Sequence, residues 1–198
     1  MITLAIETSS DLGSIAVHRD GSILFSKTFA AGRRNSAGLF IELMAARDSV
    51  DTFDSIVVGL GPGSYSGVRI AIATAIGLAR ATKATLLGIP SIATLECQEE
   101  TYYVTGDARR ESFYLARISS RTLQTDPELF PYSEAEQRLS GLTPLFATAP
   151  LSFFPGAVIR PPSAIILAQL AAENRGIRCR DMLDPIYLRE PHITRPRM

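Results

Sequence analysis

The sequence predicts an α/β protein of two lobes, each with a mixed sheet flanked by helices, with the second lobe abbreviated. Two observations lead to this prediction. The first half runs strand, strand, strand, helix, strand, helix, strand, and after Pro90 the chain begins again with three strands. Successive strands favour a meander, whereas strands separated by helices join a sheet through right-handed crossovers. We therefore divide the chain into residues 1–98 and residues 99–198.

The first three strands are predicted at residues 2–6, 13–19 and 22–29, where apolar residues form a short run or alternate with polar ones. Alternation places one face of a strand against a core. Asp20-Gly21, between the second and third strands, is a strong hairpin signal, because this turn needs positive φ values that glycine adopts without strain. An antiparallel meander is expected.

Helices and strands alternate over the rest of the first half. Leu39 and Leu43, like Phe40 and Met44, stand at i,i+4 spacing within residues 36–47, which is typical of an amphipathic helix. A buried strand, a glycine-rich loop, a second helix and another strand are predicted at residues 55–60, 61–67, 68–83 and 84–89. This order is the layout of a ribonuclease-H-like lobe.

The second half is predicted to echo the first with shorter elements, because prolines are frequent between residues 127 and 162 and interrupt regular structure. Its three strands are expected at residues 102–106, 111–118 and 121–125, and its helices around residues 133–139 and 163–174.

Composition restricts the function classes. The chain of 198 residues is 46% hydrophobic, enough for a substantial core, and its 20 basic and 20 acidic residues cancel. No net field then attracts a polyanion, so contact with nucleic acid is expected to be local or through a partner.

No segment reaches the roughly 20 apolar residues of a spanning helix, and residues 1–6 are too short for a signal peptide. We expect a cytoplasmic protein without a membrane partner, in which Cys97 and Cys179 stay reduced.

Two loops are candidate phosphate sites. The first follows the opening strand and offers hydroxyl and N–H groups at a hairpin tip, for which an ordinary polar turn is the alternative. The second lies between a strand and a helix, where N–H groups and the helix dipole converge on an anion. It lacks the P-loop, GxGxxG and GxSxG patterns, so a specialised tight turn is equally compatible. The candidate residues are Glu7, Thr8, Ser9, Gly61, Gly63 and Ser64.

The helix at residues 68–83 is apolar nearly all round and rich in small side chains. Small side chains allow another backbone to approach closely, which favours a subunit interface. A crossover helix buried within one lobe is the alternative, although such a helix should still show a polar outer stripe.

Signals for catalysis are missing from the sequence. His18 and His192 are the only histidines, and His18 occupies an alternate, outward strand position. No HExxH or HxxxH pair is present for a metal, and no local motif supports a Ser-His-Asp triad. We therefore predict no catalytic residue and no metal ligand.

The basic C-terminal region, with Arg189, Arg195 and Arg197, is predicted to be a solvated surface, and direct RNA contact is the less favoured alternative.

Four motifs together resemble the TsaB (YeaZ) family, glycoprotease-like members of the actin, sugar-kinase and Hsp70 superfamily. They are Leu4-Ala5-Ile6-Glu7-Thr8-Ser9, Gly59-Leu60-Gly61-Pro62-Gly63-Ser64-Tyr65-Ser66-Gly67-Val68-Arg69-Ile70, Asp107-Ala108-Arg109-Arg110 and Pro185-Ile186-Tyr187-Leu188-Arg189. The glycine-rich motif is the most specific. The resemblance implies the actin-like ATPase fold over almost the whole chain.

The resemblance implies an accessory subunit that binds and activates TsaD, the catalytic paralogue that transfers a threonylcarbamoyl group to an adenosine of the tRNA anticodon loop. TsaE, an ATPase, is implied as a further partner, a homodimer is implied for the protein alone, and tRNA is expected only through the complex. No firmly bound cofactor is implied, with ATP or ADP as candidates at the complex interface.

The family pairs through the helices of its first lobe, and this places the expected partner interface on the two long helices. The expected interface residues are Asn35, Ser36, Leu39, Leu43, Arg69, Ile72, Ala75 and Ile76. Two positions depart from the family pattern: Glu7 replaces an aspartate, and Asn35-Ser36-Ala37 replaces a His-Ser-Glu stretch. A stand-alone ATP-dependent phosphotransferase or a glycoprotease-like peptidase is the alternative function.

Overall fold

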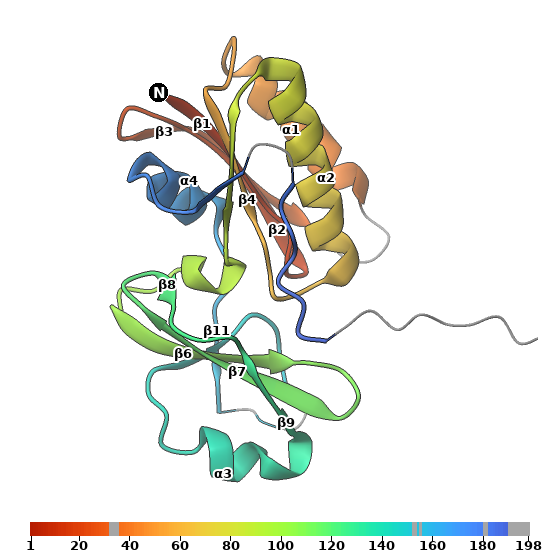
Figure 1. Cartoon of the computed structure of the whole chain (residues 1–198), viewed down its shortest axis with the longest axis vertical. Helices are drawn as coiled ribbons and strands as arrows, with labels where there is room; N and C mark the ends of the chain where they lie inside the picture. Colours follow the sequence, from red (N-terminus) through yellow and green to blue (C-terminus); the bar gives the residue numbers. More distant parts are fainter. Residues whose placement is uncertain (32–35, 152–153, 155, 180–181, 190–198) are drawn as a thin grey trace, which may run out of the picture.

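The computed structural model describes residues 1–31, 36–151, 154, 156–179 and 182–189. Two sheets lie one above the other along the long axis of the molecule (Figure 1). The first has the strand order β12-β5-β4-β1-β2-β3, and the second has the order β11-β10-β6-β7-β8 with β9 paired to β7. Each sheet is mixed, and helices pack on both, so the predicted fold class is confirmed.

The first sheet contains the five strands predicted from the first half and one strand from the end of the chain. β1, β4 and β5 run parallel, whereas β2, β3 and β12 run antiparallel to their neighbours. The strands are β1 (Ile2–Glu7), β2 (Leu12–Arg19), β3 (Ser22–Ala30), β4 (Ser55–Gly59), β5 (Thr85–Ile89) and β12 (Ile177–Cys179).

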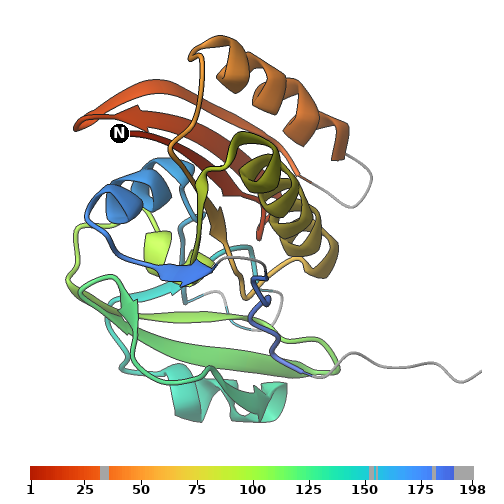
Figure 2. The same ribbon diagram turned by 45° about the horizontal axis from the view of Figure 1, so that its top comes forward.

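Helices cover both faces of the first sheet (Figure 2). On one face, α1 (Ser36–Asp48) and α2 (Tyr65–Thr82) pack over a core that includes Ile6 and Ile15. On the other face, α4 (Ala164–Ala172) packs over Ala5 and Ala16. Neighbouring residues of one strand thus serve opposite cores, as the two-residue repeat of a strand requires.

The second sheet is smaller and has its own helix. One face contributes Tyr102 and Ile118 to the core shared with α4, and the other contributes Phe113 to a core beneath α3 (Ala135–Leu139). Its strands are β6 (Thr101–Asp107), β7 (Ser112–Ser119), β8 (Thr122–Leu123), β9 (Glu128–Pro131), β10 (Leu145–Ala147) and β11 (Val158–Ile159). The described residues also form the 3-10 turns η1 (Ser91–Thr94) and η2 (Tyr132–Glu134).

Two of the segments that connect the sheets, around residues 94–97 and 162–163, are bonded to each other. Leu95 forms a β-bridge with Pro162, and the N–H of Ser163 donates to the carbonyl of Thr94 at 3.0 Å. Arg121, in the turn between β7 and β8, donates to the carbonyls of Leu95 and Cys97, both at 2.5 Å. The crossing region is therefore held by backbone and guanidinium hydrogen bonds together.

Several sequence predictions need correction. The strand expected at residues 121–125 is reduced to β8, and β9 to β12 were not predicted. His18, expected to point outward, is 5% exposed because α4 covers that face of β2. The division at residue 98 stays a prediction, and α4 and β12, from beyond it, pack on the first sheet.

Candidate functional site

A cleft of about 950 Å³ lies where loops of the two lobes meet. The β1–β2 loop and the β4–α2 loop line it from the first lobe. The β6–β7 loop, residues 148–151 after β10, and residues 185–189 complete its wall. All four motifs that the sequence analysis singled out contribute to this lining.

The two candidate phosphate loops are bonded directly to each other. The N–H of Ser64 donates to the carbonyl of Ser9 at 2.7 Å, and the hydroxyl of Thr8 donates to the carbonyl of Gly67 at 2.8 Å. A Cβ atom at Gly63 would stand 2.1 Å from the carbonyl oxygen of Ser9, a distance that no real contact allows. Glycine is required here by the close approach of the two backbones.

Several donors of these loops are used inside the protein. The N–H of Ser9 donates to Oε1 of Glu7 at 2.6 Å, and the N–H of Gly61 donates to the hydroxyl of Ser91 at 3.0 Å. The hydroxyl of Ser64 caps α2 by accepting from the N–H of Gly67 at 3.3 Å. A phosphate would have to compete with these internal acceptors for the same N–H groups.

The predicted loop residues divide into two groups. Ser9, Gly63 and Ser64 line the cleft. Thr8 and Gly61 are buried behind it, and Glu7 is completely buried. The structure thus brings the two candidate loops together, which the sequence analysis did not predict, and their role in binding a nucleotide stays a prediction.

Glu7 is a titratable group inside the first lobe rather than on the cleft wall. Burial raises the pKa of its carboxyl group above the ordinary value, and hydrogen bonds from Ser9 and Ser91 act in the opposite direction. Its Oε2 lies 1.9 Å from the position that a Cβ at Gly59 would take, so the side chain fills space that only glycine leaves open.

The wall on the second lobe carries an ion pair, in which Nη1 of Arg109 lies 3.1 Å from Oδ2 of Asp107. Asp107 accepts from the N–H of Arg109 at 2.6 Å and from the hydroxyl of Tyr132 at 3.0 Å. Arg109, Arg110 and Glu111 all have positive φ, between 52° and 62°, in the turn between β6 and β7. The segment between the strands expected at residues 102–106 and 111–118 is thus a tight turn, and its contribution to the cleft was not predicted.

A second candidate site is the outer face of α1 and α2, where a partner interface was predicted. Three of the predicted residues, Leu39, Ile72 and Ala75, are 2%, 5% and 0% exposed and belong to the core of the lobe. They leave no side-chain surface for a partner. Leu43 and Ile76 are half-buried and Arg69 is exposed. Asn35 and the side chain of Ser36 lie outside the part of the chain that the structure describes.

The exposed apolar residues on this face are different ones. Phe40, Ile41 and Met44 of α1 are 47%, 65% and 70% exposed. On α2, Ala73 and Gly77 are exposed on the same side as Arg69, at four-residue intervals. The spacing signal was present in the sequence, but a helix that is apolar nearly all round does not show which face is turned outward. We call Phe40, Ile41, Met44, Arg69, Ala73 and Gly77 the outer helix face.

Over residues 1–31, 36–151, 154, 156–179 and 182–189, no group of three or more His, Cys, Asp or Glu side chains is placed to hold a metal ion. Across the same ranges, no helix has the length and apolar character needed to cross a membrane.

Comparison with known proteins first defines the class of fold. A solved structure from Pseudomonas aeruginosa, described as an uncharacterized protein with similarity to peptidase YEAZ, superposes with a TM-score of 0.74 at 24% identity. It covers 95% of this chain and 99% of that one. YeaZ from the same organism gives a TM-score of 0.67 at 23% identity over 89% and 95% of the two chains. The two-lobed fold is thus that of YeaZ.

Sequence comparisons add particular relatives. Residues 38–128 match the family model of TsaD, tRNA N6-adenosine threonylcarbamoyltransferase. The tRNA threonylcarbamoyladenosine biosynthesis protein TsaB of Escherichia coli K12 is 28% identical over 100 residues. That alignment covers 48% of this chain and 42% of TsaB, so it spans less than half the length of the relative. The predicted resemblance to TsaB (YeaZ) proteins is confirmed.

Proposed function

We propose that the chain is an accessory subunit for tRNA threonylcarbamoyladenosine synthesis, and that it binds and activates a TsaD-type catalytic subunit without transferring the group itself. The similarity to TsaB and to the TsaD model supplies the pathway. The observation that carries the proposal is the outer helix face: apolar side chains of α1 are exposed on it, and a Cβ at Gly77 of α2 would meet no other described residue within 4 Å.

The apolar part of the outer helix face is costly to leave in water. Burying a large apolar side chain stabilises a structure by about 1.5–3 kcal/mol. Phe40, Ile41 and Met44 are exposed on one helix, and aromatic residues and Met are enriched in interfaces. A partner that covers all three therefore gains substantial binding free energy.

Gly77 points to close approach by that partner. Glycine inside a helix is less favourable than alanine by about 1 kcal/mol. At Gly59, Gly63 and Gly67 a Cβ would collide with neighbouring atoms, whereas at Gly77 a Cβ would meet nothing within 4 Å among the described residues. The internal packing gives no reason for glycine at this position, and a second helix lying against the outer helix face gives one.

The alternative classes, a phosphotransferase or a peptidase, draw no support from the cleft. A phosphotransferase would bind ATP at the two loops, yet the N–H groups of Ser9, Gly61 and Ser64 are directed to protein acceptors. We propose that ATP or ADP, when it is bound, lies at the interface of the complex. A homodimer through the outer helix face, TsaE as a further partner and tRNA contact through the complex are parts of the same proposal.

The test is threonylcarbamoyl transfer to tRNA by the cognate TsaD and TsaE, supplied with threonylcarbamoyl-adenylate, with and without this chain. We expect transfer only when the chain is present. The Met44→Asp variant should lose at least tenfold in activation, because it places a charge in the apolar contact. Ile177→Asp is the matched control. Ile177 is 61% exposed, but it lies on β12, at the other edge of the sheet from β3, against which α1 packs. Equal transfer without the chain would overturn the proposal.

A further inference from the structure

The last described segment, residues 182–189, runs from the first lobe to the second past the cleft (Figures 1 and 2). Its beginning is fixed to the first lobe. Leu183 is 5% exposed and packs in the core under α2, and the N–H of Ile186 donates to the carbonyl of Leu60 at 2.8 Å. We call residues 185–189 the C-terminal strap.

The end of the C-terminal strap is fixed to the second lobe. Leu188 packs against the core that the two sheets share. The guanidinium of Arg189 donates to the hydroxyl of Ser112, on β7, at 2.8 Å. Tyr187 lies between these two attachments and is still 43% exposed. Contacts on both sides therefore hold the backbone of Tyr187, and its side chain stays partly exposed beside the cleft.

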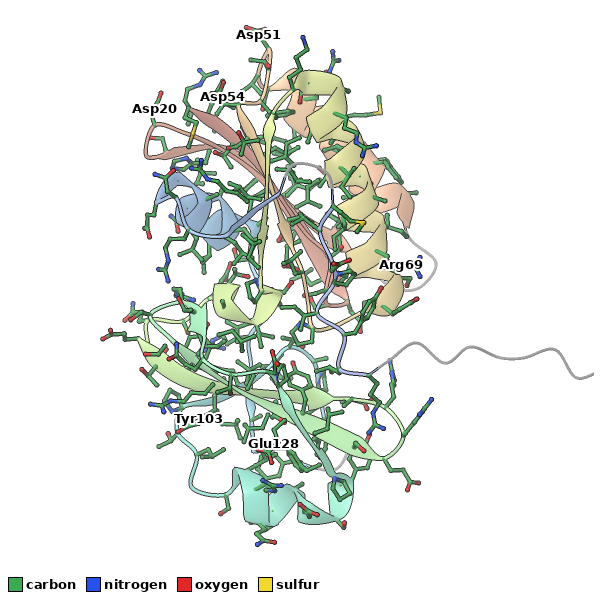
Figure 3. All side chains as sticks on the ribbon, viewed as in Figure 1. Asp20, Asp51, Asp54, Arg69, Tyr103 and Glu128 are labelled. Carbon is green, nitrogen blue, oxygen red and sulfur yellow. The ribbon has the colours of Figure 1, made fainter. Side chains whose placement is uncertain are left out.

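Tyr187 stacks on the first residue of α2. Its ring centroid is 5.6 Å from that of Tyr65, with an interplanar angle of 34°. Arg69 then donates to the hydroxyl of Tyr65 at 2.5 Å, and its guanidinium lies 5.1 Å from the centre of the Tyr65 ring. Figure 3 shows Arg69 at the cleft-side end of α2. Tyr187, Tyr65 and Arg69 thus form one continuous stack, which we call the tyrosine–arginine stack.

We propose that the tyrosine–arginine stack is part of the partner surface and extends the outer helix face onto the C-terminal strap. This inference rests on the proposed function. Continuity supports it, because Arg69 belongs to both the stack and the outer helix face. Residue type supports it as well, since Tyr and Arg are enriched among the residues that contribute most to binding.

Preorganisation is the physical reason for placing a strap here. Ordering a flexible side chain on binding costs about 0.5–1.5 kcal/mol. The two attachments of the C-terminal strap and the stacking on Tyr65 already order Tyr187 in the folded protein, so this cost does not reduce the affinity for the partner. The partner chemistry follows from the groups displayed: an apolar side chain against the Tyr187 ring and a carboxylate opposite Arg69.

The experiment measures the Kd of purified cognate TsaD for full-length variants of this chain, at two salt concentrations. We expect Tyr187→Ala to raise Kd about tenfold and Tyr187→Phe, which keeps the stacked ring, to stay within twofold of the original. Arg69→Ala should raise Kd and reduce its salt dependence, because the carboxylate contact is lost. The double variant should lose less than the product of the single losses.

Controls separate binding from stability. Tyr103→Ala removes a half-buried tyrosine of the second sheet, so it should lower the melting temperature and leave Kd unchanged. Arg69→Ala removes an exposed side chain that contacts Tyr65, so it tests the stack even where Tyr187→Ala folds poorly.

The possible results distinguish this inference from the proposed function. The inference is overturned when Met44→Asp weakens binding but Tyr187→Ala and Arg69→Ala leave Kd within twofold. The interface then ends at the helices. When TsaD fails to bind the unaltered chain, or Met44→Asp has no effect, the proposed function itself is wrong, and the inference is lost with it.

Discussion

The cleft loops and the outer helix face both belong to the first lobe and both contain glycine. In the loops, packing within the protein requires glycine, whereas on the outer helix face it does not. In the loops, Gly63 is required by contact with Ser9, and the polar groups bind one another. On the outer helix face, a Cβ at Gly77 would meet no described atom within 4 Å outside its own helix, and apolar side chains stay exposed. Glycine can therefore allow two backbones to pack closely inside the protein at one place and leave room for a partner on the surface at another.

The largest expected effect is in the loops. Gly63→Ala should destabilise the protein by about 3 kcal/mol, because the new Cβ would stand 2.1 Å from the Ser9 carbonyl and would force the loops apart. Urea unfolding followed by circular dichroism would measure the loss. A change below about 0.5 kcal/mol would show that the two loops are free to separate.

An intermediate effect is expected at Glu7, behind the loops. Because the pKa of Glu7 is raised in the folded state, the folded protein holds this proton at pH values where the unfolded chain releases it. The stability that Glu7 contributes is therefore present below its ordinary pKa and declines as the pH rises above that value.

The Glu7→Gln variant removes this titration while keeping an oxygen for the N–H of Ser9. We expect it to unfold at a higher urea concentration than the original at pH 7.5, with the difference shrinking toward pH 4. Parallel curves for the two proteins across this range would contradict a raised pKa. Chemical denaturation at several pH values would make the comparison.

The smallest effect is expected at Gly77. Gly77→Ala should stabilise the isolated chain by up to about 1 kcal/mol, since alanine favours the helix and the added methyl group meets no described atom. The same change should weaken partner binding, because it fills space at the contact. Unfolding midpoints and Kd values measured on one preparation would show whether stability rises while affinity for the partner falls. A rise in both stability and affinity would contradict close approach of a partner at Gly77.

The sequence was informative where periodicity is long and local. The meander, α1 and the strand–loop–helix unit around Ser64 follow from alternation, i,i+4 spacing and glycine clustering. α2 begins three residues earlier than predicted because Ser64 caps it. The short strands β9 to β12 have two to four residues, too few for a pattern to emerge.

The site was harder to predict than the fold, for two physical reasons. The burial of Ile72 and the exposure of Met44 depend on which side of each helix meets the sheet, and an almost wholly apolar helix does not encode that choice locally. His18 was misplaced because one strand face was assumed to be solvated, whereas α4, from about 145 residues further along, covers it.

Because residues 164–179 pack on the first sheet, that sheet is completed late in synthesis. Ser14 accepts a hydrogen bond from the N–H of Ala164, and β12 closes the edge of β5. Until residues 164–179 have left the ribosome, the first sheet has one apolar face bare and one parallel edge strand open. A nascent chain that stops near residue 98 would present both to its neighbours, which is the situation in which unfinished sheets associate with one another.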